Sequence, residues 1–160
     1  MRYAAADMGP AVLLGVSFLS PDGDIPEPPQ GFVPHESRGA FAKHNGPYFD
    51  RLVSEGSEQA FFVLPRHCNG LGIIHGGMLS AFLDSLLASA AARAAQAVPV
   101  TIHLSLDFLD MGRAGDWVLG EARTTRLTRD LAFVEGRAHM QERTLARASG
   151  VFKLMRRREA

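Results

Sequence analysis

Apolar residues dominate one unbroken stretch in the middle of the chain, from Gly76 to Ala97. It is mostly Ala, Leu, Met and Phe without proline, which predicts a helix of about six turns. At about 100° per residue, the polar stripe on one side of this helix is formed by Ser85, Ser89, Arg93 and Gln96. Ser80 and Asp84 lie together on the opposite side. Because a helix that is apolar nearly all round is covered by other elements, the carboxylate of Asp84 needs a partner or a chemical role.

After Pro99 the apolar residues alternate with polar ones, which is typical of a strand with one covered face. In "VTIHLSLDFL" one face carries Ile102, Leu104, Leu106 and Phe108, and the other carries Thr101, His103, Ser105 and Asp107. Further strand patterns are "DWVLGEARTTRL", "LAFVEGRAHMQE" and "TLARASGVFKLM", joined by short turns. Four successive strands with short connections predict an antiparallel meander.

Two shorter patterns precede the central helix. "SEQAFFVLP" is typical of a strand that ends at Pro65, and "GAFAKHNGPYFDRLV" has a short helical pattern broken at "NGP". One long apolar helix and an antiparallel sheet with one covered face predict an α+β fold, in which the sheet wraps around the helix.

The N-terminal part of the chain differs in composition. "SPDGDIPEPPQGFVP" contains five of the nine prolines, so residues 1–30 are expected to be an irregular extension and residues 31–160 the compact domain. "AVLLGVSFL" at 11–19 is too short to span a bilayer, and "SPDGD" follows where a signal peptide needs small residues, so we expect neither a signal peptide nor a membrane partner. The single cysteine, Cys68, excludes an internal disulfide and fits a cytoplasmic protein.

The charges balance over the whole chain but not along it. Seventeen Lys and Arg match seventeen Asp and Glu, which gives no indication of a nucleic acid partner. Residues 1–112 hold six basic against eleven acidic side chains, and residues 113–160 hold eleven against six. The C-terminal third could therefore attract an anionic ligand, or its charges could be solvated strand faces and a basic tail, "RRR" at 156–158.

The segment "NGLGIIHGGMLSAFLD" resembles the signature of hotdog-fold thioesterases of the phenylacetate-degradation type. In that family an Asn, then "G..HGG", then an Asp nine residues after the His form the site. The resemblance extends over about residues 38–155 and includes "HNGPYF" upstream. It implies a homodimer with a continuous sheet, often paired into a dimer of dimers, that binds acyl-CoA at the subunit interface and needs no cofactor.

The residue chemistry agrees with this resemblance. If Gly76 and Gly77 open the helix, their unpaired N–H groups could polarise a thioester carbonyl. Asn69 could donate to the same carbonyl or hold a water, and Asp84 could act as general base or as nucleophile. Asp84 lies about 12 Å along the helix from Gly76. The resemblance implies that the Asp comes from the neighbouring subunit.

Each of these residues also has a purely structural interpretation. Asp84 could be satisfied by backbone or by Ser80, and Asn69 could form a turn in a glycine-rich loop. His75 fits a structural role in holding the loop better than a proton shuttle. His67, Cys68 and His75 do not have the spacing of a metal site, so we expect no metal.

Binding of CoA is expected at two further places. The resemblance implies that Thr101 lies near the thioester, and that the turn "RLTRDL", with Arg126, Arg129 and Asp130, contacts the nucleotide. Relatives usually have a glycine where this turn has Thr128, so an ordinary exposed hairpin is the alternative. The function expected is an acyl-CoA thioesterase, with a hotdog dehydratase or a non-catalytic acyl-CoA-binding module as alternatives.

Overall fold

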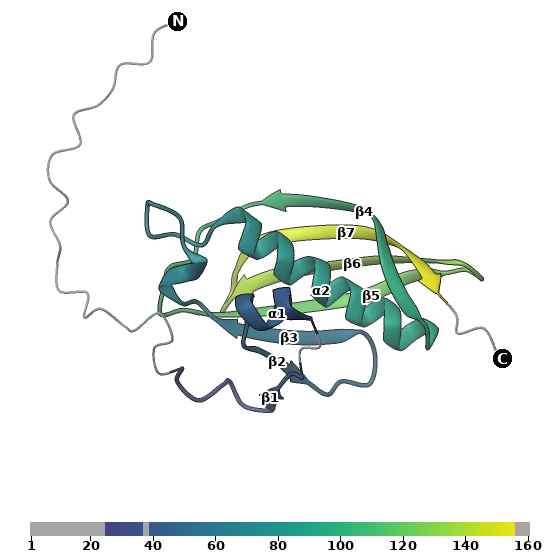
Figure 1. Cartoon of the computed structure of the whole chain (residues 1–160), viewed down its shortest axis with the longest axis horizontal. Helices are drawn as coiled ribbons and strands as arrows, with labels where there is room; N and C mark the ends of the chain where they lie inside the picture. Colours follow the sequence, from purple (N-terminus) through teal and green to yellow (C-terminus); the bar gives the residue numbers. More distant parts are fainter. Residues whose placement is uncertain (1–24, 37–38, 156–160) are drawn as a thin grey trace, which may run out of the picture.

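The computed structural model describes residues 25–36 and 39–155. The "AVLLGVSFL" segment, the "RRR" tail and most of the expected N-terminal extension lie outside the described residues. Within them the chain forms the α+β fold predicted from the sequence, a seven-stranded sheet curved around one long helix (Figure 1). In chain order the elements are β1 Phe32–Pro34, α1 Ala40–Asn45, β2 Tyr48–Arg51, β3 Ser57–Phe62, a 3-10 turn Pro65–His67, α2 Gly76–Ala95, β4 Val98–Phe108, β5 Trp117–Leu127, β6 Leu131–Met140 and β7 Arg143–Met155.

All pairs of neighbouring strands are antiparallel, in the order β1-β2-β3-β5-β6-β7-β4. The expected four-strand meander is therefore only partly correct. β5, β6 and β7 follow one another, but β4 lies beside β7 at the sheet edge and β3 takes the place next to β5. This order results from the helix between β3 and β4. Because α2 lies across the sheet, it carries the chain from β3 to the far edge, where β4 pairs with β7. The two short N-terminal strands, β1 and β2, were not predicted as strands.

The central helix agrees with its prediction almost to the residue, since α2 ends at Ala95. Its buried side chains are Met78, Leu79, Phe82, Leu83, Leu86, Leu87, Ala90 and Ala91, and they form one core with the inner face of the sheet. Among the described residues α2 is the one helix long and apolar enough to cross a membrane by length and composition. Its place in this core accounts for that composition without a membrane.

Glycines on the inner face of the sheet bring α2 close to the strands. A Cβ on Gly120 would lie 2.7 Å from side-chain atoms of Phe82 and Leu86, and a Cβ on Gly136 would lie 3.0 Å from Leu87. Both distances are shorter than an ordinary van der Waals contact between carbon atoms. The separation of helix and sheet therefore depends on the absence of a side chain at Gly120, whereas a Cβ on Gly136 would first meet the Glu121 carbonyl oxygen of the neighbouring strand, at 2.6 Å.

A β-bulge in β4 changes which residues share a face. Thr101 pairs with Phe152 and His103 with Val151, so Ile102 is an extra residue between them. The expectation that Thr101 faces away from Leu104 is therefore wrong, since the bulge shifts the alternation by one residue. Thr101 lies on the side of the sheet that faces α2.

Candidate active site

The loop before α2 is closed by its own hydrogen bonds. The Asn69 N–H donates to the carbonyl of Ile73, and the Gly72 N–H donates to the carbonyl of Asn69. The Asn69 side chain forms a turn as well, because its Oδ1 accepts from the Leu71 N–H at 2.9 Å. None of the hydrogen bonds found among the described residues uses Asn69 Nδ2. The turn interpretation is therefore correct, and it leaves the amide donor that the functional interpretation requires.

His75 caps α2 by accepting a hydrogen bond from one of the two N–H groups expected to bind the oxyanion. Its Nδ1 accepts from the Gly77 N–H at 2.8 Å, so the prediction that the Gly77 N–H is unpaired is wrong. Gly77 has to lack a side chain for this contact, since a Cβ there would lie 2.9 Å from the same nitrogen. An Nδ1 that accepts leaves the proton of a neutral imidazole on Nε2. His75 thus holds the loop, as the structural interpretation predicted.

The Gly76 N–H remains as the donor at the start of α2. It takes part in none of the backbone hydrogen bonds that the described residues form around this loop. It also lies at the positive end of the helix dipole of a 20-residue helix. The ring of Phe108, at the end of β4, packs against Gly76, with its nearest atom 3.4 Å from the position of a Cβ there. The site therefore offers one backbone donor beside an aromatic ring.

Asp84 finds its partner on β4. Thr101 Oγ1 donates to Asp84 Oδ1 at 2.8 Å, and the carboxylate is only half-buried under the edge strand. Ser80, the partner considered from the sequence, instead donates to the Gly76 carbonyl at 2.8 Å. The carboxylate thus keeps its second oxygen for another ligand. Because it lies about 12 Å along the helix from Gly76, one chain does not bring the two groups to one carbonyl.

The turn expected to contact a nucleotide is well formed. Thr128 closes the turn with its side chain, because its Oγ1 donates to the Leu131 carbonyl and accepts from the Leu131 N–H. Asp130 is tied to β7 through the Leu154 N–H, which donates to its carbonyl. The same turn carries Arg126 and Arg129.

This turn lies at the other end of the sheet from Gly76. Leu131 is in register with Lys153, and Lys153 with Val100, whereas Gly76 is packed against Phe108. Eight residues of β4 separate the two ends, which is about 26 Å. Within one chain, the turn and Gly76 are therefore too far apart to bind the same part of a substrate.

Sequence reasoning considered His67 only as a metal ligand and missed that it is buried next to the loop. His67 is 3% exposed, and its Nδ1 accepts from the Leu64 N–H at 3.1 Å. Burial and the neighbouring charge of Arg66 lower the pKa of His67 to about 4, so the ring is neutral at pH 7. Burial also raises the pKa of the Cys68 thiol, which keeps it a weak nucleophile. No group of side chains suited to a metal ion occurs among the described residues.

A second polar cluster, on the other side of α2, was also missed. His35 Nδ1 lies 2.5 Å from Asp50 Oδ2, and Gln59 Nε2 donates to Asp50 Oδ1 at 3.0 Å and to Ser89 Oγ at 3.2 Å. These bonds tie β2 and β3 to the polar stripe of α2. The sequence carried no signal for them beyond that stripe, because the partners come from distant segments.

A curved antiparallel sheet around one long helix is the hotdog fold, and the glycine-rich start of α2 with a carboxylate two turns later fits the thioesterases of this fold. Comparison with known proteins agrees. The family model described as "Thioesterase superfamily" matches residues 71–147. The protein "Putative esterase PA0474" of Pseudomonas aeruginosa is 37% identical over 129 residues, which cover 79% of this chain and 96% of that protein. The chain belongs to the thioesterase superfamily.

Solved structures show the same fold. One is a "putative thioesterase, phenylacetic acid degradation-related protein" of Ralstonia eutropha JMP134, with a TM-score of 0.65, 28% identity, and coverage of 72% of this chain and 89% of that chain. Another is a "hypothetical thioesterase protein with coenzyme A" of Streptococcus pneumoniae TIGR4, with a TM-score of 0.65, 19% identity, and coverage of 70% and 91%.

Proposed function

We propose that the protein hydrolyses acyl-CoA thioesters to a carboxylic acid and CoA. The observation that carries this proposal is the unpaired Gly76 N–H at the start of α2, which can stabilise the oxyanion formed when water attacks a thioester carbonyl. One such donor is worth about 10²- to 10³-fold in kcat in other hydrolases. Asn69 Nδ2, at the mouth of the same loop, is the second donor or the ligand of the attacking water.

Asp84 supplies the base in this proposal. Water loses a proton to its carboxylate as the oxygen attacks the carbonyl carbon, and the C–S bond then breaks as the protonated Asp84 returns this proton to the sulfur, so that CoA leaves as the thiol. Attack by the carboxylate itself, through a mixed anhydride that water then hydrolyses, uses the same group as nucleophile. In both routes Thr101 holds Oδ1 at 2.8 Å and leaves Oδ2 toward the substrate.

The two halves of the site come together in a homodimer. β4 has a free edge, and Val98, Val100 and Ile102 along it are all more than half exposed. Antiparallel pairing of two β4 edges runs the Thr101 end of one strand toward the Phe108 end of the other. This pairing shortens the path from Asp84 of one protomer to Gly76 of its partner. The same arrangement brings the turn with Arg126 and Arg129 toward the partner's Gly76.

CoA as the leaving group is supported by a relative and by charge. The Streptococcus pneumoniae relative of this fold was solved with coenzyme A. The turn with Arg126 and Arg129 offers guanidinium groups suited to phosphates. A cytoplasmic location, where acyl-CoA is available, is part of the proposal and fits the single free cysteine.

The test is release of free thiol from a panel of acyl-CoA esters of different length and with aromatic groups. We expect saturable release of CoA that is lost in Asp84→Ala. A module that only binds acyl-CoA would show saturable affinity without thiol. A dehydratase would change the absorbance of the acyl double bond and release no thiol, and either result would overturn the proposal.

A further inference from the structure

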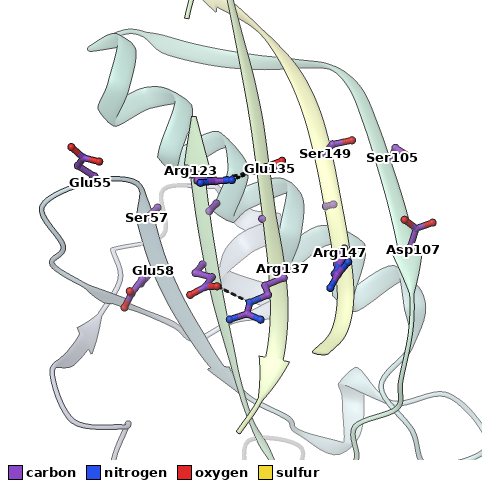
Figure 2. A pocket seen from close by; sticks show the side chains of 14 residues that line it. Glu55, Ser57, Glu58, Ser105, Asp107, Arg123, Glu135, Arg137, Arg147 and Ser149 are labelled. Atoms are coloured by element: carbon purple, nitrogen blue, oxygen red, sulfur yellow. Dashed lines mark hydrogen bonds and ion pairs between the residues drawn. The ribbon is translucent and has the colours of Figure 1, made fainter. Parts of the chain in front are cut away.

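Two buried side-chain atoms have no hydrogen-bond partner among the described residues, Gln59 Oε1 and His67 Nε2. The charged outer face of the sheet differs, because side chains there pair with each other. Figure 2 shows this face, with a cavity of about 710 Å³ and Arg137 Nε donating to Glu121 at 2.6 Å. A buried N–H without a partner costs stability, so His67 is a poor choice for stability alone. Its place next to the loop of the candidate site relates it to function instead.

The ring of His67 is fixed on two sides. Its Nδ1 accepts from the Leu64 N–H at 3.1 Å, and the His67 N–H donates to the Leu64 carbonyl at 2.9 Å. The ring also lies edge-on against Phe61, with the ring centroids 5.7 Å apart, and Phe61 packs against Phe82 of α2 at 4.8 Å. The side chain therefore joins the chain that leaves β3 to the middle of α2.

The backbone of His67 closes the loop that carries the candidate donors. The His75 N–H donates to the His67 carbonyl at 2.9 Å, and Gly76 is the next residue. On the other arm of the loop, Asn69 comes two residues after His67. A movement of His67 would therefore displace both donors, and a displacement of about 1 Å in a catalytic site can cost about 10²-fold in rate.

The end of α1, which carries the motif "HNGPYF", supports the same place from outside. Arg66 Nη2 donates to the Gly46 carbonyl at 2.5 Å. Burial lowers the pKa of His67, and the backbone of Asn45 acts in the opposite direction, which places this backbone beside the ring. A Cβ on Gly46 would lie 2.9 Å from the Ala42 carbonyl oxygen, so the close approach requires glycine. The motif thus has a role although it supplies no candidate catalytic group.

We propose that His67 is a positioning residue, which holds Asn69 and the Gly76 N–H where a substrate carbonyl can bind them. The inference rests on the proposed function, because these donors matter only for a substrate with a carbonyl group. The part of the ring that acts is the Nδ1 acceptor. In an ordinary capping box a Gln or Glu at this position of the turn accepts from the same backbone N–H.

Two variants of equal side-chain length separate the acceptor from the ring. His67→Gln keeps an oxygen that can accept from the Leu64 N–H, His67→Met has no strong acceptor, and both lose the ring contact with Phe61. In His67→Met we expect kcat of thiol release to fall about 10²-fold with KM unchanged. In His67→Gln it should stay within about 3-fold of the wild-type value, because the capping bond is kept. Val134→Ala, a buried position on β6 outside the loop, is the stability control and should lower Tm without changing kcat.

A second measurement does not require hydrolysis. An alkyl-CoA thioether and the ketone analogue with a methylene group between sulfur and carbonyl differ in the group that the donors bind. The wild-type chain should bind the ketone about 10-fold more tightly, which corresponds to one or two neutral hydrogen bonds. His67→Gln should keep this preference and His67→Met should lose it, with the affinity for the thioether equal in all three proteins.

The outcomes separate the inference from the proposed reaction. This binding pattern without thiol release would support the role of His67 and contradict hydrolysis. The inference is overturned if His67→Met keeps the wild-type kcat and ketone preference, if His67→Gln loses as much as His67→Met, or if Val134→Ala loses as much kcat. Equal weakening of both analogues also overturns it. His67→Leu replaces His67→Met if that chain does not fold, and if neither folds the inference is overturned, because His67 then serves folding itself.

Discussion

Replacing Asp84 by Asn separates a catalytic carboxylate from a structural one. The amide has the same shape, and its oxygen can still accept from Thr101 Oγ1, which lies 2.8 Å from Asp84 Oδ1 in the wild-type chain. What disappears is the negative charge that takes a proton from water. We therefore expect kcat to fall by about 10² to 10⁴, the usual contribution of a positioned base, while the protein stays folded.

The stability change can be bounded from the same contact. A hydrogen bond to a charged group contributes about 1.5–3 kcal/mol and a neutral one about 0.5–1.5, so the exchange costs about 1–1.5 kcal/mol when corresponding ends of the two ranges are compared. Since Asp84 is only half-buried, solvent reduces this further. For a domain of this size, 1 kcal/mol corresponds to about 2–4 °C in Tm.

Both quantities are measured on one preparation, with kcat from thiol release and Tm from circular dichroism. Asp107→Asn is the matched control, because it makes the same change on β4 at an exposed position, and both readouts should stay at wild-type values. A variant with Tm lowered by about 10 °C and kcat per folded molecule preserved would refute the catalytic role of Asp84.

Three further predictions follow from the site and its surroundings. Mixing inactive Asn69→Ala and Asp84→Ala chains should restore thiol release, and no recovery despite proven subunit exchange would contradict a shared site. Arg126→Ala and Arg129→Ala should raise KM and leave kcat unchanged, since phosphate contacts are equal in ground and transition states; a fall in kcat alone would contradict this. The pKa of His67 is about 4 in the folded chain and about 6.5 in the unfolded chain, so between these pH values only the unfolded chain is protonated at this residue. The free energy of unfolding therefore falls as the pH drops from about 6.5 to about 4. At about pH 4.5 the loss is about 2.5 kcal/mol, and denaturation of His67→Gln should show an acid sensitivity smaller by that amount.

The fold was predictable where the pattern of apolar residues is strong. α2 and the four long strands after it follow from periods of 3.6 and 2, and their number and order left few ways to cover the helix. β1 and β2 were not found, because each has at most four residues, too few to display a period. The place of β4 beside β7 depends on pairing across the whole sheet, and no local pattern encodes it.

The site was predictable as a set of residues but not as a set of contacts. Asn69, Gly76 and Asp84 follow from the motif. The β-bulge at Ile102, where the pairing of β4 with β7 shifts by one residue, could not be deduced from the alternation of apolar and polar residues. That shift is what turns the Thr101 hydroxyl toward Asp84. The use of the Gly77 N–H by His75 depends on a ring orientation that residue types do not specify.

Gly120 and Gly136 have a genetic consequence. A side chain at Gly120 would push α2 away from the sheet, and α2 carries both the Gly76 donor and Asp84. A side chain at Gly136 would clash mainly with the neighbouring strand, because its Cβ would lie 2.6 Å from the Glu121 carbonyl oxygen. A random screen for lost hydrolysis should therefore return substitutions at these two glycines, although neither touches a substrate. Second-site suppressors of a substitution at Gly120 should be smaller residues at Phe82 or Leu86, because trimming the helix side recreates the missing space, whereas the backbone contact at Gly136 is not relieved in this way. Gly120 and the facing helix positions are thereby coupled, so their amino acids should change together among descendants of this chain.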